Sequence, residues 1–259
     1  MAAAETFSFS RVTTFEQCPR RYRYRYLDGV REAFQSIEAF MGQRVHEAIE
    51  WLFREKGDGR LRAADEAVRE YTAAFDREFA AARGSLKVIR QGTAVEEYRR
   101  SGAAMLADFH KDRFRSDSLE TVGIEKHFVL EIEPGTRFQG YIDRLARDAR
   151  GTTHIIDYKT GGRPPSSFTG KDADQLEAYA IAMFEQTTAD ELVLTLEYLR
   201  NGSTQSRRIR REDTAETRRR LVARIRMAGE ASVFPTSPGA LCDWCGYNDL
   251  CESYRPRVR

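Results

Sequence analysis

The segment GYIDRLARDARGTTHIIDYKTGG, residues 140–162, contains two apolar strand patterns joined by a short turn. Successive strand side chains point to opposite faces, so Asp157 and Lys159 share a face and Tyr158 points to the other. If the turn centres on Arg150, Asp143 lies directly opposite Asp157 on the neighbouring strand. The Cβ atoms of such a cross-strand pair are about 4.5–5.5 Å apart. The sequence therefore predicts two carboxylates and one ammonium group at one end of a hairpin.

Two facing aspartates need a partner, because like charges directly opposite each other destabilise a sheet. A divalent cation such as Mg²⁺, which binds carboxylate oxygens, would neutralise Asp143 and Asp157 together. Lys159, on the same face, could orient a metal-bound water or stabilise charge developing on a phosphate. The alternative is a surface ion pair on an exposed strand, and the apolar flank of Ile155 and Ile156 argues against it.

The elements around this hairpin predict an α+β fold with helices in front of the sheet. The first helix begins at Ser10 or Thr13, which fit N-caps, and ends near Leu27. Further elements are helices over 36–56, 61–83 and 92–115, strands over 121–133, 136–148 and 152–159, a helix over 173–186, strands over 191–200 and 203–210, and a basic helix over about 213–230. Asn201-Gly202 between the last two strands is typical of a type I′ turn.

Asp143 followed by Asp157-x-Lys159 at a strand end resembles the pattern of PD-(D/E)XK nucleases. The surrounding GYIDRLARD and HIIDYKTG are similar to the RecB-type branch, which includes the nuclease domains of RecBCD and AddAB and the CRISPR-associated RecB-like exonucleases. This resemblance implies a restriction-endonuclease-like core with a central mixed sheet flanked by helices. It also implies an N-terminal helical region and a C-terminal cysteine region.

Two helical motifs extend the resemblance. MGQRVHEAIEWL resembles the Gly-x-x-x-His helix of the branch, which implies that His46 is a metal ligand. QLEAYA resembles its Gln-x-x-x-Tyr helix, which implies that Gln175 and Tyr179 lie beside the active site and help to hold DNA. Taken alone, each of these residues would fit an ordinary amphipathic helix. Glu125, on the strand before Asp143, could line the same site.

The four cysteines fall into one group near the N-terminus, Cys18, and one near the C-terminus, Cys242-x-x-Cys245-x5-Cys251. In a reducing cytosol disulfides are disfavoured, and four thiolates suit Zn²⁺ or an iron–sulfur cluster. RecB-type members with one cysteine near the N-terminus and three near the C-terminus hold a [4Fe–4S] cluster, which the resemblance implies here. Zinc and unligated thiols are the alternatives. We expect the main role of a cluster to be structural, because it would join the two ends of the chain. Redox sensing is the alternative role.

The segment CPRRYRYRYL, residues 18–27, alternates arginine with tyrosine. Arg21 and Tyr22 are candidates for contacts with DNA, because arginine suits phosphates and aromatic rings stack on bases. The alternative is a helix with one aromatic core face and one solvated arginine face.

The composition indicates a soluble globular protein of 259 residues, 41% of them hydrophobic and 32% charged. MAAAETFSFS lacks the pattern of a secretory signal, and no apolar run approaches a membrane span, so we expect a cytoplasmic protein. The net charge of +2 does not by itself indicate nucleic acid. We expect a single nuclease domain over residues 1–259, with cluster regions at 8–30 and 233–259, a helical region at 31–118 and a core at 119–232.

The predicted function is metal-dependent cleavage of DNA. Asp143, Asp157, His46 and the carbonyl oxygen of Tyr158 would bind Mg²⁺ or Mn²⁺, and Lys159 would position the attacking water. The resemblance favours single-stranded DNA and exonuclease action in DNA repair, recombination or CRISPR adaptation. No G-x-x-x-x-G-K-[ST] motif is present, so ATP is not expected and any helicase would be another chain. The rival functions are a partner-dependent DNA-binding subunit of a helicase–nuclease or adaptation complex, and a phosphodiesterase acting on RNA or nucleotides.

Overall fold

The structure is a computed structural model that describes residues 5–162 and 164–255. Residues 1–4 and 256–259, the ends of the predicted domain, and Arg163, in the predicted 161–170 loop, lie outside the described residues. A central mixed sheet has the strand order β1-β5-β6-β7-β8, with β4 also paired to β5. Its strands are β1 (Glu5–Ser8), β4 (Glu120–Glu133), β5 (Thr136–Arg147), β6 (Thr153–Lys159), β7 (Glu191–Tyr198) and β8 (Ser203–Arg210). The β1–β5 and β6–β7 pairs are parallel and the others antiparallel.

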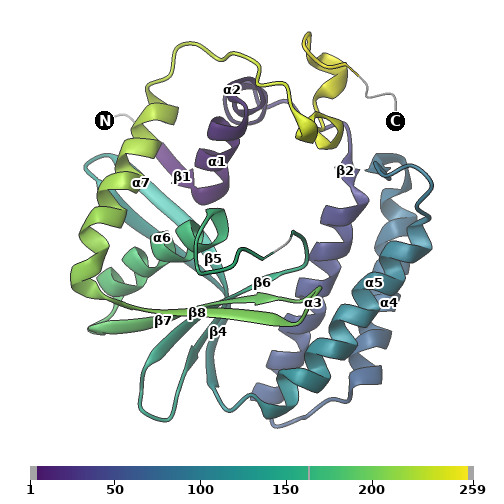
Figure 1. The fold of residues 1–259 in the computed structure, drawn as a ribbon, viewed down its shortest axis with the longest axis vertical. Helices are drawn as coiled ribbons and strands as arrows, with labels where there is room; N and C mark the ends of the chain where they lie inside the picture. Colours follow the sequence, from purple (N-terminus) through teal and green to yellow (C-terminus); the bar gives the residue numbers. More distant parts are fainter. Residues whose placement is uncertain (1–4, 163, 256–259) are drawn as a thin grey trace.

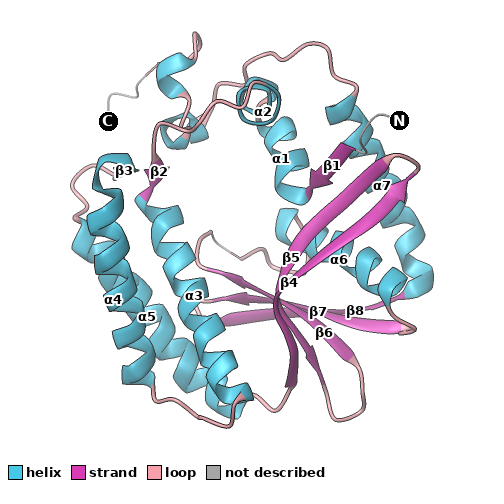
Figure 2. Ribbon diagram, turned by 180° about the vertical axis from the view of Figure 1, so that it is seen from behind, coloured by secondary structure: helices cyan, strands magenta, loops and turns pink. Residues whose placement is uncertain are grey.

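Helices cover the sheet from both sides, as Figures 1 and 2 show. They are α1 (Phe9–Gln17), α2 (Pro19–Tyr22), α3 (Ile37–Gly57), α4 (Ala64–Ala82), α5 (Val95–Asp112), α6 (Lys171–Gln186) and α7 (Thr214–Gly229). The helices α3, α4 and α5 are here named the front helices. A short parallel pair, β2 (Gln35–Ser36) with β3 (Leu86–Lys87), joins them. This is the predicted sheet with flanking helices. Within the described residues, none of the helices is long and apolar enough to cross a membrane.

The core is divided into two hydrophobic clusters by the sheet. The first core lies between the sheet and α1, α6 and α7 and includes Ile155; the second core lies against α3, α4 and α5 and includes Ile156 and Tyr158. Adjacent residues of β6 enter different cores because side chains alternate along a strand. The apolar run of β6 is therefore a strand buried on both faces.

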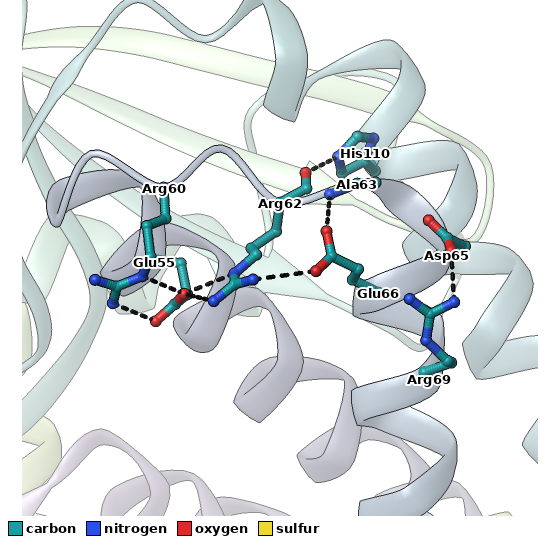
Figure 3. Close-up of polar contacts among 8 residues, drawn as sticks. All are labelled: Glu55, Arg60, Arg62, Ala63, Asp65, Glu66, Arg69 and His110. Carbon is teal, nitrogen blue, oxygen red and sulfur yellow. Dashed lines mark hydrogen bonds and ion pairs between the residues drawn. The ribbon is translucent and has the colours of Figure 1, made fainter.

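The front helices are joined by a charged turn between α3 and α4 (Figure 3). Glu55 accepts hydrogen bonds from Arg60 and Arg62, each at 2.7 Å, and these bonds lower the pKa of Glu55 to about 2. His110 of α5 approaches the Arg62 carbonyl oxygen to 2.8 Å. The turn is thus tied to all three front helices.

The prediction of the first helix is wrong in two respects: the helix starts at another residue, and it is interrupted. It begins at Phe9, and Ser8 is its N-cap, because the β1 strand extends to Ser8 and delivers an extended residue there. It breaks at Cys18, which has extended backbone angles and precedes Pro19, a neighbour that disfavours helical geometry. A turn of π-helix over Arg23–Leu27 follows α2.

The predicted type I′ turn is also wrong. Tyr198 pairs with Ser203, so the β7–β8 loop has four residues, 199–202, rather than two. The Leu199 amide donates to the Lys159 carbonyl oxygen at 2.9 Å, and its side chain is buried in the second core. Leu199 therefore stays with β6 and cannot pair with β8.

Candidate active site

The β5–β6 hairpin brings the two predicted aspartates together. The ladder pairs Arg144 with Ile156 and Leu145 with Ile155, so Asp143 and Asp157 come next, at the open end of the hairpin. There the ladder stops, and the Tyr158 amide donates to Asp143 Oδ2 at 2.9 Å. Asp143 thus replaces a strand carbonyl as the acceptor, which fixes its carboxylate beside β6.

Lys159 stands beside Asp157, with its Nζ atom 2.8 Å from Asp157 Oδ2 and 3.6 Å from Asp172 Oδ1. Its ammonium also donates to Gln175 Oε1 at 3.1 Å, and Gln175 Nε2 donates to the Tyr179 hydroxyl at 3.0 Å. Burial alone would lower the pKa of Lys159, but Asp157 and Asp172 raise it above its ordinary value. Gln175 and Tyr179, one helical turn apart on α6, therefore hold a charged Lys159 in place.

A glycine allows α6 to approach this closely. A Cβ atom on Gly140 would lie 2.7 Å from the Tyr179 ring and 2.8 Å from the Phe128 ring. Both contacts are shorter than side-chain atoms tolerate, so any larger residue would displace Tyr179. Tyr179 packs edge-on against Phe128, with ring centroids 5.1 Å apart.

A second glycine places His46 at the same site from the opposite helix, α3. A Cβ atom on Gly42 would lie 2.7 Å from Thr160 Oγ1, so glycine lets α3 pack against the end of β6. One turn later, His46 Nδ1 lies 3.4 Å from Asp143 Oδ2. Burial lowers the pKa of His46, while Asp157 and a backbone hydrogen bond with Tyr158 oppose that shift. A neutral imidazole can serve as a metal ligand.

Glu125 joins this group from β4. Ligand atoms of His46, Glu125 and Asp143 all lie within 4.8 Å of one another. Asp157 is not a member of this group in the described part of the chain; its Oδ2 atom faces Lys159 instead. The sequence predicted Glu125 only as a residue lining the site. Its position opposite Asp143, between the Ile124–Arg144 and Lys126–Ile142 pairs, could have indicated its closer role.

The backbone at Glu125 is unusual. Its φ is +47°, and no other non-glycine residue in the described ranges has a positive φ. Such a conformation costs about 1–3 kcal/mol in a non-glycine residue and is concentrated at functional sites. The surrounding fold therefore holds Glu125 at the site against a local preference.

The site is strongly acidic. Burial, and then the charge of Asp157, raise the pKa of Asp143 well above its usual range, although the Tyr158 amide lowers it. Burial likewise raises the pKa of Glu50 and of Glu125. A cavity of about 480 Å³ opens between α3 and the hairpin and is lined by the carboxylates of Glu38, Glu47, Glu50, Glu125 and Asp143. Carboxylate oxygens with one imidazole nitrogen fit Mg²⁺ or Mn²⁺, and a cation there would relieve this repulsion.

The side chain of Tyr158 lies in the core, whereas its main chain lies at the site. Its side chain is 4% exposed and packs in the second core against Phe53 and Phe109. Its backbone bonds to Asp143 at the site. This arrangement agrees with strand alternation and leaves only the main chain of Tyr158 for a ligand role.

The four cysteines line one cavity of about 220 Å³, away from the carboxylates. The chain ends are tied together around it. The Arg20 amide and guanidinium donate to the carbonyl oxygens of Pro235 and Phe234, and the Tyr24 hydroxyl donates to that of Leu250. Figure 1 shows the C-terminal segment beside α2.

The predicted DNA contact by Tyr22 is wrong. Tyr22 is 1% exposed, and its ring packs among Phe15, Tyr26 and Phe234 in the first core. A fully buried ring cannot stack on a base. Arg21 lines the cysteine cavity and pairs with Glu32 at 2.9 Å, so it lies with the cysteines rather than with the carboxylates.

Comparison with known proteins agrees with this geometry. A sequence profile of the PD-(D/E)XK nuclease superfamily matches residues 6–252. The chain belongs to the PD-(D/E)XK nuclease superfamily. A member of this superfamily is a metal-dependent nuclease that binds nucleic acid, and the acidic group around Asp143 is a possible metal site.

Comparisons with curated proteins and with solved structures add little to this assignment. No curated protein matches the chain. Among solved structures 28 chains match, one of them titled "Crystal structure of SSO0001". That chain is 15% identical, with a TM-score of 0.41, over 98% of this chain and 88% of its own length.

Proposed function

We propose that this PD-(D/E)XK nuclease is a DNA exonuclease of the RecB type that prefers single-stranded DNA. The observation that carries the proposal is the contact between Lys159 and Asp157 at 2.8 Å, beside Asp143 at the open end of the hairpin. An ammonium group and two carboxylates at the open end of one hairpin can together hold a cation and orient a water molecule. The preference for single strands and for strand ends follows from the RecB-type resemblance of the motifs.

Asp143, Asp157, His46 and the Tyr158 carbonyl oxygen would hold Mg²⁺ or Mn²⁺, with Glu125 within reach of the same ion. When bound, the cation polarises the phosphodiester and makes a bound water more acidic. Lys159 stays protonated beside Asp157 and donates a hydrogen bond that orients the attacking water or the phosphate oxygen.

Gln175 fixes the direction of the Lys159 ammonium, and Tyr179 fixes Gln175. These two residues support the reaction through Lys159. Their own contact with DNA, which the resemblance implies, is part of the proposal.

The test is digestion of end-labelled single-stranded DNA by anaerobically purified protein, with and without Mn²⁺, beside Lys159→Ala. We expect Mn²⁺-dependent cleavage that the variant loses while it still melts in one cooperative transition. A circular single strand should resist, because an exonuclease needs an end, and an RNA strand of the same sequence should compete poorly. Equal cleavage by Lys159→Ala would show that the active site lies elsewhere. Absence of cleavage by the wild type would favour the partner-dependent DNA-binding role.

The proposal includes a [4Fe–4S] cluster held by Cys18, Cys242, Cys245 and Cys251. All four cysteines line one cavity, which supports a ligand that they share. The RecB-type resemblance of the motifs supports a cluster over a single zinc ion. Iron, sulfide and zinc analysis of anaerobically purified protein decides between them, and one zinc per chain without iron would refute the cluster.

We further propose a cytoplasmic role in DNA repair, recombination or CRISPR adaptation, beside a helicase or adaptation proteins. The support is the RecB-type resemblance of the motifs. Affinity purification of the Lys159→Ala protein from its own cells, followed by identification of the bound proteins, tests this. Recovery of neither class of partner would argue for independent action.

A further inference from the structure

The β4–β5 hairpin carries an exposed pair of rings close to the acidic site. His127 and Tyr141 face each other across the two strands, with ring centroids 4.6 Å apart and planes inclined by 30°. His127 is exposed, and Tyr141 is 55% exposed, a high value for a large aromatic residue on a sheet. Gln139 lies 3.3 Å from His127 Nε2. The two rings are thus stacked on each other, and this exposed stacked pair is here named the ring platform.

Strand alternation places the ring platform on the α3 side of the sheet. Ile142 belongs to the first core and Leu145 packs against it, whereas Ala146 belongs to the second core. Two residues separate Ile142 from Leu145, so alternation reverses between them, at the level of Asp143. Tyr141 points opposite to Ile142, and therefore toward the face that α3 covers. On β4, the reversal coincides with the positive φ of Glu125.

The ring platform is also close to the proposed reaction centre. His127 and Tyr141 are each two residues from Glu125 and Asp143 on their strands, a spacing of about 7 Å. A nucleotide whose phosphate lies at Asp143 can reach that far with its base. The cavity with His46 on its wall opens on the same side of the sheet.

The charges beside the ring platform select the part of the nucleotide that binds there. Glu47, Glu50 and Glu125 line the neighbouring cavity, and their carboxylates repel phosphate groups that no cation neutralises. An uncharged base meets no such repulsion and gains stacking energy on an aromatic ring. The surroundings therefore favour a base over the sugar–phosphate backbone.

We infer that the base of one nucleotide, next to the phosphate that is cut, stacks on the exposed face of Tyr141, whose other face rests on His127. This inference rests on the proposed nuclease function and deepens it. A base can reach the ring platform only when it is unpaired, because base pairing holds it inside the duplex. The ring platform thus gives the site a physical reason to prefer single strands over duplex DNA.

The test compares cleavage of an ordinary single strand with that of an equal-length strand made of abasic residues, in Mn²⁺. For the wild type, we expect kcat/KM to be about 5- to 100-fold higher on the strand with bases. For Tyr141→Ala, this ratio should fall to about one, and Tyr141→Trp should restore it because tryptophan also stacks. Val122→Ala, another exposed residue of β4, is the matched control and should keep the wild-type ratio.

The outcomes separate the inference from the function on which it rests. If the wild type cleaves neither strand, the proposed function fails. If the wild type cleaves both strands at equal rates, or Tyr141→Ala keeps the wild-type ratio, the ring platform is not a base-binding site while the nuclease function stands. A melting curve of each variant shows whether its fold is kept, and Tyr141→Trp keeps the test decisive if the alanine variant unfolds.

Discussion

The carboxylate site and the cysteine cavity both join residues that are far apart in the chain, but they are built differently. At the carboxylate site, Asp143 and Asp157 extend a regular ladder, and Lys159 is held by a side chain of α6. Around the cysteines, the described residues from 230 to 255 form short 3₁₀ turns, Ala240–Trp244 and Asn248–Leu250, and no longer helix or strand. A site made by a ladder keeps its shape without a ligand, whereas a site made by turns depends far more on what it binds.

This contrast makes removal of a cysteine the largest expected effect. If the proposed cluster is present, Cys245→Ser should lose it and release the chain ends, because the ligand would contribute folding free energy directly. We expect a melting transition that is much lower or no longer cooperative, followed by circular dichroism, with loss of iron. Ser237→Ala, which changes another residue of the same cavity, is the control. An unchanged melting transition in Cys245→Ser would mean that hydrogen bonds alone hold the chain ends.

Lys159→Ala should show the opposite behaviour, with activity lost and the fold kept. We expect kcat on single-stranded DNA to fall by about 10²–10⁴, the usual contribution of a group that manages a proton or developing charge. The fold should be kept because the strand ladder of β6 does not depend on this side chain, although loss of the ion pair with Asp157 should lower the melting temperature. A variant that no longer melts in one cooperative transition would contradict a site made independently by the ladder.

Gly42→Ala tests how exactly α3 must approach the strand end. The added Cβ atom would lie 2.7 Å from Thr160 Oγ1, so either this side chain or α3 must shift, and a shift of α3 would carry His46 away from Asp143. We expect Mn²⁺ affinity, measured by calorimetry, to fall about 10- to 100-fold. Adding Thr160→Ala removes the hydroxyl and should restore most of the affinity. A double variant no better than Gly42→Ala would show that the contact does not position His46.

Prediction from sequence was most accurate for features that depend on residues close together in the chain. The register of the hairpin that leads to Asp143 and Asp157 follows from one tight turn, and strand alternation alone separates Tyr158 from its neighbours. The type I′ turn at Asn201-Gly202 was wrong because a contact distant in sequence, between Leu199 and Lys159, decides the loop. Local turn preference cannot reveal such a contact.

Long-range packing also explains the other errors. The β1 strand has four residues, too few for a clear pattern, and it exists because β5 offers a parallel partner. Tyr22 looked like a ligand for DNA because arginine and tyrosine alternate around it, but Phe234 from the other end of the chain covers it. The unusual backbone of Glu125 is likewise set by the fold rather than by its neighbours in sequence.

The smallest expected effect is a pH dependence of metal binding at the carboxylate site. The pKa of Asp143 is raised by burial and by Asp157, so below that pKa the metal-free site holds a proton that a bound cation must displace. Mn²⁺ affinity should therefore rise with pH, by at most about tenfold per unit for each proton released, and level off above the raised pKa. Calorimetry in two buffers of different ionisation enthalpy counts the protons. An affinity that does not rise with pH above the ordinary aspartate pKa of about 3.9 would contradict a protonated site.

The same pKa sets the sign of the stability change. In the unfolded chain the Asp143 carboxyl ionises near its ordinary pKa of about 3.9, whereas the folded metal-free protein keeps the proton to higher pH. The folded state then binds more protons in the interval between the two pKa values, so the free energy of unfolding falls as pH rises through it. Asp143→Asn, which cannot ionise, should lose this slope. Saturating Mn²⁺ should reverse it, because the cation stabilises the ionised carboxylate that burial otherwise disfavours.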